Sequence, residues 1–143
     1  MNIILIEARV EELLSKDQTG HGFDHTKRVR EMAVRFANDS IKNGESVDVE
    51  AVEIAALLHD VDDYKLVGKD AAETLENAQR IMVEAGCGKQ MRLRVIEIIQ
   101  NMGYFKSSKR NSSAQSRRAN SVRRRFVRCD WHYWYNAGVS IRN

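Results

Sequence analysis

The chain contains no proline, and only 8 of its 143 residues are glycine. Because these two residues most often end helices, long helical segments meet few interruptions. Its two cysteines, Cys87 and Cys129, match no metal-binding or redox spacing, so we expect free thiols. The first apolar run, residues 3–6, is too short for a signal sequence or a membrane span. We therefore expect a cytoplasmic protein, not associated with a membrane, whose length allows one domain with a buried core.

The positive charge of the chain is confined to its last quarter. Residues 1–106 carry 14 Lys and Arg against 19 Asp and Glu, a net charge of −5. Residues 107–143 carry 9 basic side chains against the single acid Asp130, a net charge of +8. The whole-chain pI near 9.0 would alone suggest nucleic-acid binding. The division predicts instead an acidic body followed by a basic tail whose composition is that of a disordered arm.

Apolar residues of the body recur at helical spacing and nowhere alternate as in a strand. We predict helices over about residues 3–14, 25–43, 49–60, 70–85 and 89–102. Asp24 and Asp48 are the expected N-caps of the second and third helices. The third is apolar nearly all round, which is typical of a buried helix. The sequence therefore predicts an all-α domain over residues 1–106 and a separate tail over residues 107–143.

A histidine at the start of the second helix and an adjacent His-Asp pair at the end of the third form a candidate metal site: His25, His59 and Asp60. Imidazole nitrogen and carboxylate oxygen together suit borderline and hard divalent ions. Antiparallel packing of the two helices would bring these residues together. Asp60 is the hardest to explain without a cation, because a carboxylate that closes an apolar helix is unfavourable unless it is paired. Taken singly, each histidine could be a surface or capping residue, and the aspartate could bind loop amides.

Two stretches carry a resemblance to a known family. Residues 20–29, Gly-His-Gly-Phe-Asp-His-Thr-Lys-Arg-Val, and residues 55–65, Ala-Ala-Leu-Leu-His-Asp-Val-Asp-Asp-Tyr-Lys, resemble the opening motifs of the HD-domain metal-dependent phosphohydrolases. The similarity is to a branch of small bacterial helical proteins and covers about residues 1–105. It implies an HD-type helical bundle, incomplete at its C-terminal end, with His25, His59 and Asp60 as metal ligands.

The resemblance also implies the cofactor, the substrate class and the reaction. We expect a divalent ion, with manganese or magnesium favoured and iron or zinc compatible, and a small phosphorylated substrate, with nucleotides as one class. Water activated by the metal would attack phosphorus. Asp63 is then the candidate general base, and Lys65 and Arg28 would stabilise charge on the phosphate. The alternative for these three residues is that they are surface charges.

The fourth metal ligand of the family, an aspartate in a later helix, is absent from this reading frame. When residues 123–134 are back-translated and shifted by one nucleotide, the codons permit the family pattern Asp-Ala-Asp-x-Leu-Asp-Ala-Ile-Gly. The codons of Trp131 and Trp134 then force two glycines at the family spacing. We therefore hypothesise that a frameshift near residues 104–112 replaced the genuine C-terminal sequence, which the coding DNA can test.

Two other functions are consistent with the sequence. The chain could be a catalytically inactive remnant of a truncated HD domain. It could also be a nucleic-acid-binding module, with the Arg-rich tail contacting phosphates and the aromatic cluster of residues 131–135 stacking on bases. We rank the nucleic-acid module last, because the frameshift already explains the tail. The sequence identifies neither the substrate nor the oligomeric state.

Overall fold

The computed structural model describes residues 1–15 and 22–107, and every regular element within them is a helix. In chain order these are α1 (Ile3–Leu14), α2 (Phe23–Lys42), α3 (Val49–Leu58), α4 (Tyr64–Val67), α5 (Lys69–Thr74), α6 (Glu76–Glu84) and α7 (Lys89–Ser107). The predicted all-α fold is confirmed. Apart from Ser107, the predicted tail over residues 107–143 lies outside the described residues. None of the helices in the described part combines the length and apolarity that a membrane crossing requires.

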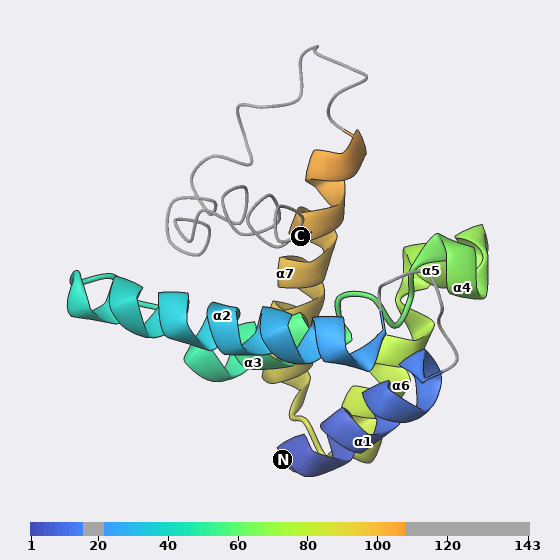
Figure 1. The fold of residues 1–143 in the computed structure, drawn as a ribbon, viewed down its shortest axis with the longest axis horizontal. Coiled ribbons are helices and arrows are strands. Elements are labelled where there is room, and N and C mark those ends of the chain that lie inside the picture. The colour runs from blue at the N-terminus through green and yellow to red at the C-terminus, as the bar shows by residue number, and fades with distance from the viewer. Residues whose placement is uncertain (16–21, 108–143) are drawn as a thin grey trace.

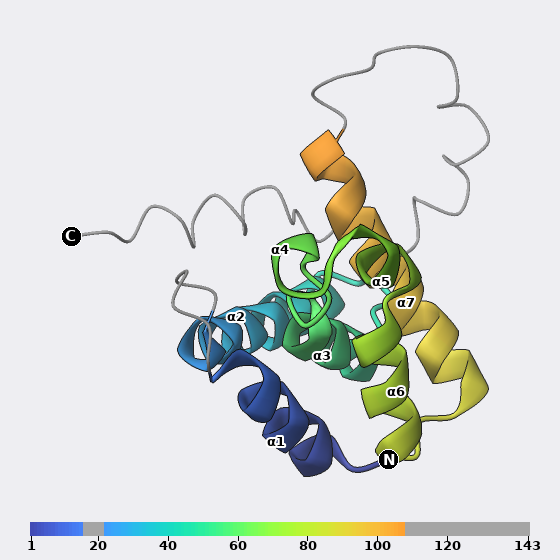
Figure 2. The same ribbon diagram turned by 90° about the vertical axis from the view of Figure 1, so that its right-hand side faces the viewer.

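Helix α3 is the central element, and α1, α2 and α7 all pack against it (Figures 1 and 2). The Asp48 carboxylate accepts a hydrogen bond from the Ala51 amide at 3.1 Å, so the predicted N-cap is confirmed. The same carboxylate pairs with Arg94 of α7. Helix α3 is therefore packed on several sides and fixed at its N-terminal end.

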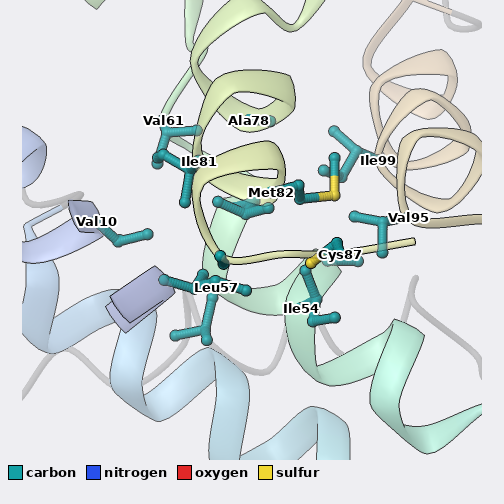
Figure 3. Packing of buried hydrophobic residues seen from close by; sticks show 14 of the residues in the cluster. Val10, Ile54, Leu57, Val61, Ala78, Ile81, Met82, Cys87, Val95 and Ile99 are labelled. Atoms are coloured by element: carbon teal, nitrogen blue, oxygen red, sulfur yellow. The ribbon is translucent and has the colours of Figure 1, made fainter. Parts of the chain in front are cut away.

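A small hydrophobic cluster of Val29, Ala33 and Ala56 lies between α2 and α3. The rest of the core is one larger cluster to which α1, α3, α6 and α7 contribute (Figure 3). Its fully buried large side chains are Ile6, Val10, Leu14, Ile54, Leu57, Leu58, Val61, Ile81, Met82 and Val95. Burying one such side chain stabilises the fold by about 1.5–3 kcal/mol. Because four of these residues belong to α3 or the turn after it, the core fixes the place where the His-Asp pair begins.

One arginine connects the first three helices. Arg30 of α2 donates to Glu53 of α3 at 2.6 Å and to Glu7 of α1 at 3.2 Å. All three side chains are about a quarter exposed, so water screens these pairs only in part. The arrangement fixes α2, and with it His25, relative to the other two helices.

The predicted cap of α2 is wrong. Gly22 is the N-cap, and its carbonyl accepts from the amide of His25 at 2.9 Å and from that of Thr26 at 3.3 Å. Asp24 instead lies exposed within the first helical turn. A carboxylate there still interacts favourably with the positive end of the helix dipole, so the residue type suits both positions.

The single helix predicted over residues 70–85 is also wrong, because the structure divides it into α5 and α6. Leu75, between them, has left-handed dihedral angles of φ 52° and ψ 48°. That conformation costs a residue with a side chain about 1–2 kcal/mol. Leu75 is only 8% exposed and belongs to the core cluster, so its burial offsets this cost.

Residues 64–74, which we call the α4–α5 excursion, protrude from the bundle (Figure 1). The sequence did not predict α4. Neither α4 nor α5 contains a buried residue. Gly68 joins them at φ 82° and ψ 169°, a conformation essentially restricted to glycine. The excursion is thus a short polar structure that contributes no buried side chain to the core.

Candidate metal centre

The structure brings together His25, His59 and Asp60, as the sequence predicted. His59 Nε2 lies 3.0 Å from Asp60 Oδ2, and His25 Nε2 lies 3.7 Å from the same oxygen. The two imidazole rings are 5.6 Å apart between centroids. One ligand atom from each residue lies within 4.8 Å of the others. The start of α2 and the end of α3 meet here because the two helices pack antiparallel.

This arrangement fits a divalent cation. Two ligand atoms that each lie about 2.1 Å from one ion are about 3.0–4.2 Å apart, depending on the angle between them. Both separations from the Asp60 oxygen fall in this range. Two imidazoles and one carboxylate form a donor set that suits manganese, iron and zinc. The three residues can therefore hold such an ion with little rearrangement.

A hydrogen bond to the backbone orients the His59 ring. Its Nδ1 lies 2.8 Å from the carbonyl oxygen of Ala56. A carbonyl can only accept, so Nδ1 carries the proton, and in the neutral ring the lone pair is then on Nε2. Nε2 and Asp60 Oδ2, 3.0 Å apart, would repel each other as two acceptors unless a proton or a shared cation compensates them. The ring is thus held in the tautomer that a metal ligand requires.

The three residues of the site differ in burial. The side chain of Asp60 is 4% exposed and that of His59 is 9% exposed, whereas that of His25 is 23% exposed. A buried carboxylate is costly unless a positive partner compensates it, and the low local dielectric strengthens attraction to a cation. A ligand from solvent would reach the site from the side of His25.

The loop after α3 is held by contacts that the sequence analysis missed. Asp62, 5% exposed, accepts hydrogen bonds from the backbone amides of Asn77 at 3.0 Å and Ala78 at 2.8 Å. The Asn77 side chain donates to the carbonyl of Val61 at 3.2 Å. No local signal could reveal these bonds, because the partners are 15 and 16 residues apart in the sequence.

The three residues predicted to act on the phosphate differ in their contacts and exposure. Asp63 is the N-cap of α4, with Oδ1 accepting from the Lys65 amide at 2.9 Å, while no described residue donates to Oδ2. Lys65 is exposed, with Nζ 5.9 Å from the centroid of the Tyr64 ring. Arg28 is exposed on α2, one turn after His25. Their catalytic roles stay predictions.

Within the described residues, no fourth His, Cys, Asp or Glu joins the cluster. The position at which the shifted frame would supply the family's last aspartate lies outside them. The candidate metal centre, as far as it is described, therefore offers two nitrogen donors and one oxygen donor.

Comparison with known proteins gave two matches. The family model described as "HD domain" matches residues 22–128, a range that includes all three residues of the cluster and extends beyond residue 106. A protein of Bacillus subtilis (strain 168), "Uncharacterized protein YpgQ", is 33% identical over 99 residues, or 69% of this chain. The match covers 45% of that relative, so the chain spans less than half of its length. No solved structure matched.

Proposed function

This chain belongs to the HD-domain family, and from that premise we propose that it hydrolyses a phosphate or pyrophosphate bond of a small phosphorylated compound, with nucleotides as the favoured class. The HD domain places the chain in a superfamily of metal-dependent phosphohydrolases. The observation that carries the proposal is the close approach of His25, His59 and Asp60, which together can bind a metal. Manganese or magnesium is the ion we favour, because both suit oxygen-rich phosphate substrates.

The residues of the site have separate tasks in this proposal. His25, His59 and Asp60 would hold the cation, and the Ala56 carbonyl keeps the His59 ring oriented for it. When bound, a divalent ion supplies Lewis acidity, which lowers the pKa of water and neutralises charge on a phosphoryl oxygen. His25 is the most exposed of the three residues, so a phosphate would approach from its side.

Three further residues act on the substrate in this proposal. Asp63 retains one carboxylate oxygen without a donor among the described residues, and that oxygen can accept a proton from the attacking water. Lys65 and Arg28 are exposed and take part in no ion pair within the described part of the chain, so both can turn towards a phosphate. Their positive charge would stabilise the charge that develops on the phosphate oxygens.

The direct test is phosphate and pyrophosphate release from a panel of nucleoside mono-, di- and triphosphates by the purified chain, with and without Mn²⁺. We expect release that depends on Mn²⁺ and that His25→Ala and His59→Ala abolish. Two ligand variants are needed because His59 also bonds the last turn of α3, so its loss could affect folding. Silence of the wild-type chain at saturating Mn²⁺ would overturn the proposal for this product. If the silent chain still bound the ion, the inactive remnant would be the better description.

A matched pair of arginines tests the proposed phosphate contact. Arg28 and Arg35 are both exposed on α2, but Arg35 lies about two turns farther from His25. Arg28→Ala should lower kcat/KM about 100-fold, as expected for the loss of a charge-stabilising donor. Arg35→Ala should leave kcat/KM within about twofold of the wild type. Equal effects of the two substitutions would remove Arg28 from the site.

A further inference from the structure

We propose that Asp62 is a positioning residue for the metal centre, because its carboxylate fastens the loop that carries His59 and Asp60 to the start of α6. The inference rests on the proposed metal site. Asp62 lies two residues after Asp60 and is equally buried, at 5% against 3% exposed. Its two oxygens are both used by α6, one by each of two consecutive amides, so it is already occupied and is not itself a spare metal ligand.

The attachment consists of hydrogen bonds from the backbone and from one side chain of α6. Asp62 Oδ1 accepts from the Asn77 amide and Oδ2 accepts from the Ala78 amide, near the amino end of α6 where amides lack helical partners. The Asn77 side chain also donates to the Val61 carbonyl, so all three hydrogen bonds run from donors on α6 to acceptors on the loop. The loop and the helix are therefore joined through both backbone and side-chain groups. Neither can shift without moving the other.

The anchor on α6 is rigid. Ala78 is fully buried, and Ile81 and Met82, on the next turn, belong to the core cluster (Figure 3). Packed side chains of this kind have little freedom to shift. The loop after α3 is thus tied to the core a second time, at a point downstream of both ligands in the sequence.

The location of the attachment explains why the site needs it. Residues 62 and 77 are the two ends of the chain segment that contains the α4–α5 excursion, in which neither helix has a buried residue. Without the attachment, Asp60 would be followed directly by a segment that packing does not hold. With it, the excursion can move while the direction of the Asp60 carboxylate stays fixed.

The experiment is a Mn²⁺ titration of the full chain, in which free Mn²⁺ is followed by electron paramagnetic resonance. We expect Asp62→Ala to weaken the Kd for Mn²⁺ about 10- to 100-fold, as is typical when a residue that orients metal ligands is lost. Asp62→Asn keeps one acceptor oxygen for the two amides and should fall between Asp62→Ala and the wild type. That graded response would follow the hydrogen bonds rather than a loss of fold, which thermal unfolding of each variant without metal will monitor.

Asp48→Ala is the matched control. Asp48 also caps a helix through its carboxylate, but at the amino end of α3, about 15 Å along the helix from His59. Its loss should lower the melting temperature by an amount similar to that for Asp62→Ala while leaving the Kd for Mn²⁺ within about twofold of the wild type. The two variants thus separate general destabilisation from a change in ligand direction.

The possible results have distinct meanings. A Kd for Asp62→Ala equal to that of the wild type would overturn the inference and leave the proposed function standing. Equal weakening by Asp48→Ala and Asp62→Ala would also overturn it, because general destabilisation would then explain both. A wild-type chain that binds no Mn²⁺ would overturn this inference together with the proposed metal site.

Discussion

Helix α3 and the α4–α5 excursion are neighbours in the chain, separated by residues 59–63, but they are built in opposite ways. Six of the ten residues of α3 are buried, whereas neither helix of the excursion has a buried residue. Two of the three predicted metal ligands, His59 and Asp60, follow the buried helix, and the predicted phosphate-contacting Lys65 lies in the exposed one. The residues predicted to need precise placement thus lie beside the buried part, while the one predicted to reach a phosphate lies on the exposed part.

Amide hydrogen exchange should show the largest difference between the two regions. Amides of α3 should exchange only through global unfolding, because the core surrounds them. Amides of the excursion should open with a free energy lower by at least about 3 kcal/mol, because little burial is lost on opening. Native-state exchange followed by mass spectrometry measures both in one experiment. Equal protection of the two regions would show that the excursion folds as part of the core.

A pair of leucines tests the same contrast through stability. Leu57 of α3 is 0% exposed and Leu66 of the excursion is 43% exposed. Leu57→Ala should lower the free energy of unfolding by about 2–5 kcal/mol, because it leaves a cavity in the core. Leu66→Ala should change it by no more than about 0.5 kcal/mol. Urea denaturation of the two variants gives both values, and a large effect at Leu66 would contradict the comparison.

Cys87 gives the smallest expected effect, which depends on pH. Burial in the core raises the pKa of its thiol above the ordinary value of about 9.0. Below that value the thiol is protonated in both the folded and the unfolded chain. It then makes the free energy of unfolding no lower. As the pH rises through it, the unfolded chain loses the proton first, so the free energy of unfolding falls.

The measurement is the urea midpoint between about pH 8 and pH 10, in a Cys129→Ser background that leaves one thiol. The decline should be smaller in a Cys87→Ala variant.

As a comparison on the exposed side, the thiol of a Lys69→Cys variant should react with a disulfide reagent much faster than Cys87. Similar reaction rates would show that the core opens as readily as the excursion.

The sequence predicted the fold wherever a local pattern decides the structure. The helix over residues 3–14, the Asp48 cap and the buried character of α3 all follow from spacing and residue type, and the structure has them. The break at Leu75 could not be predicted, because a leucine in a helical pattern normally continues the helix. Only the contact of Leu75 with distant core residues and the attachment of α6 to Asp62 make the left-handed turn favourable.

The sequence could predict that His25, His59 and Asp60 lie close together, but not the contacts that support them. His25, His59 and Asp60 stand at helix ends whose antiparallel packing a sequence pattern can suggest. The bond from His59 to Ala56 and those from Asp62 to α6 depend on side-chain directions and on pairing across 15 or more residues. For the same reason the sequence analysis did not predict that Asp63 caps α4.

The closed base of the excursion has a consequence for how such a domain can diversify. Because Asp62, Asn77 and Ala78 join the two ends of the segment, the length of chain between them can change without altering the frame that carries the ligands. Adding residues to a surface loop costs little closure entropy, about 0.6 kcal/mol for each doubling of its length. Insertions and new sequences near Gly68 can therefore accumulate while the arrangement of His25, His59 and Asp60 stays unchanged.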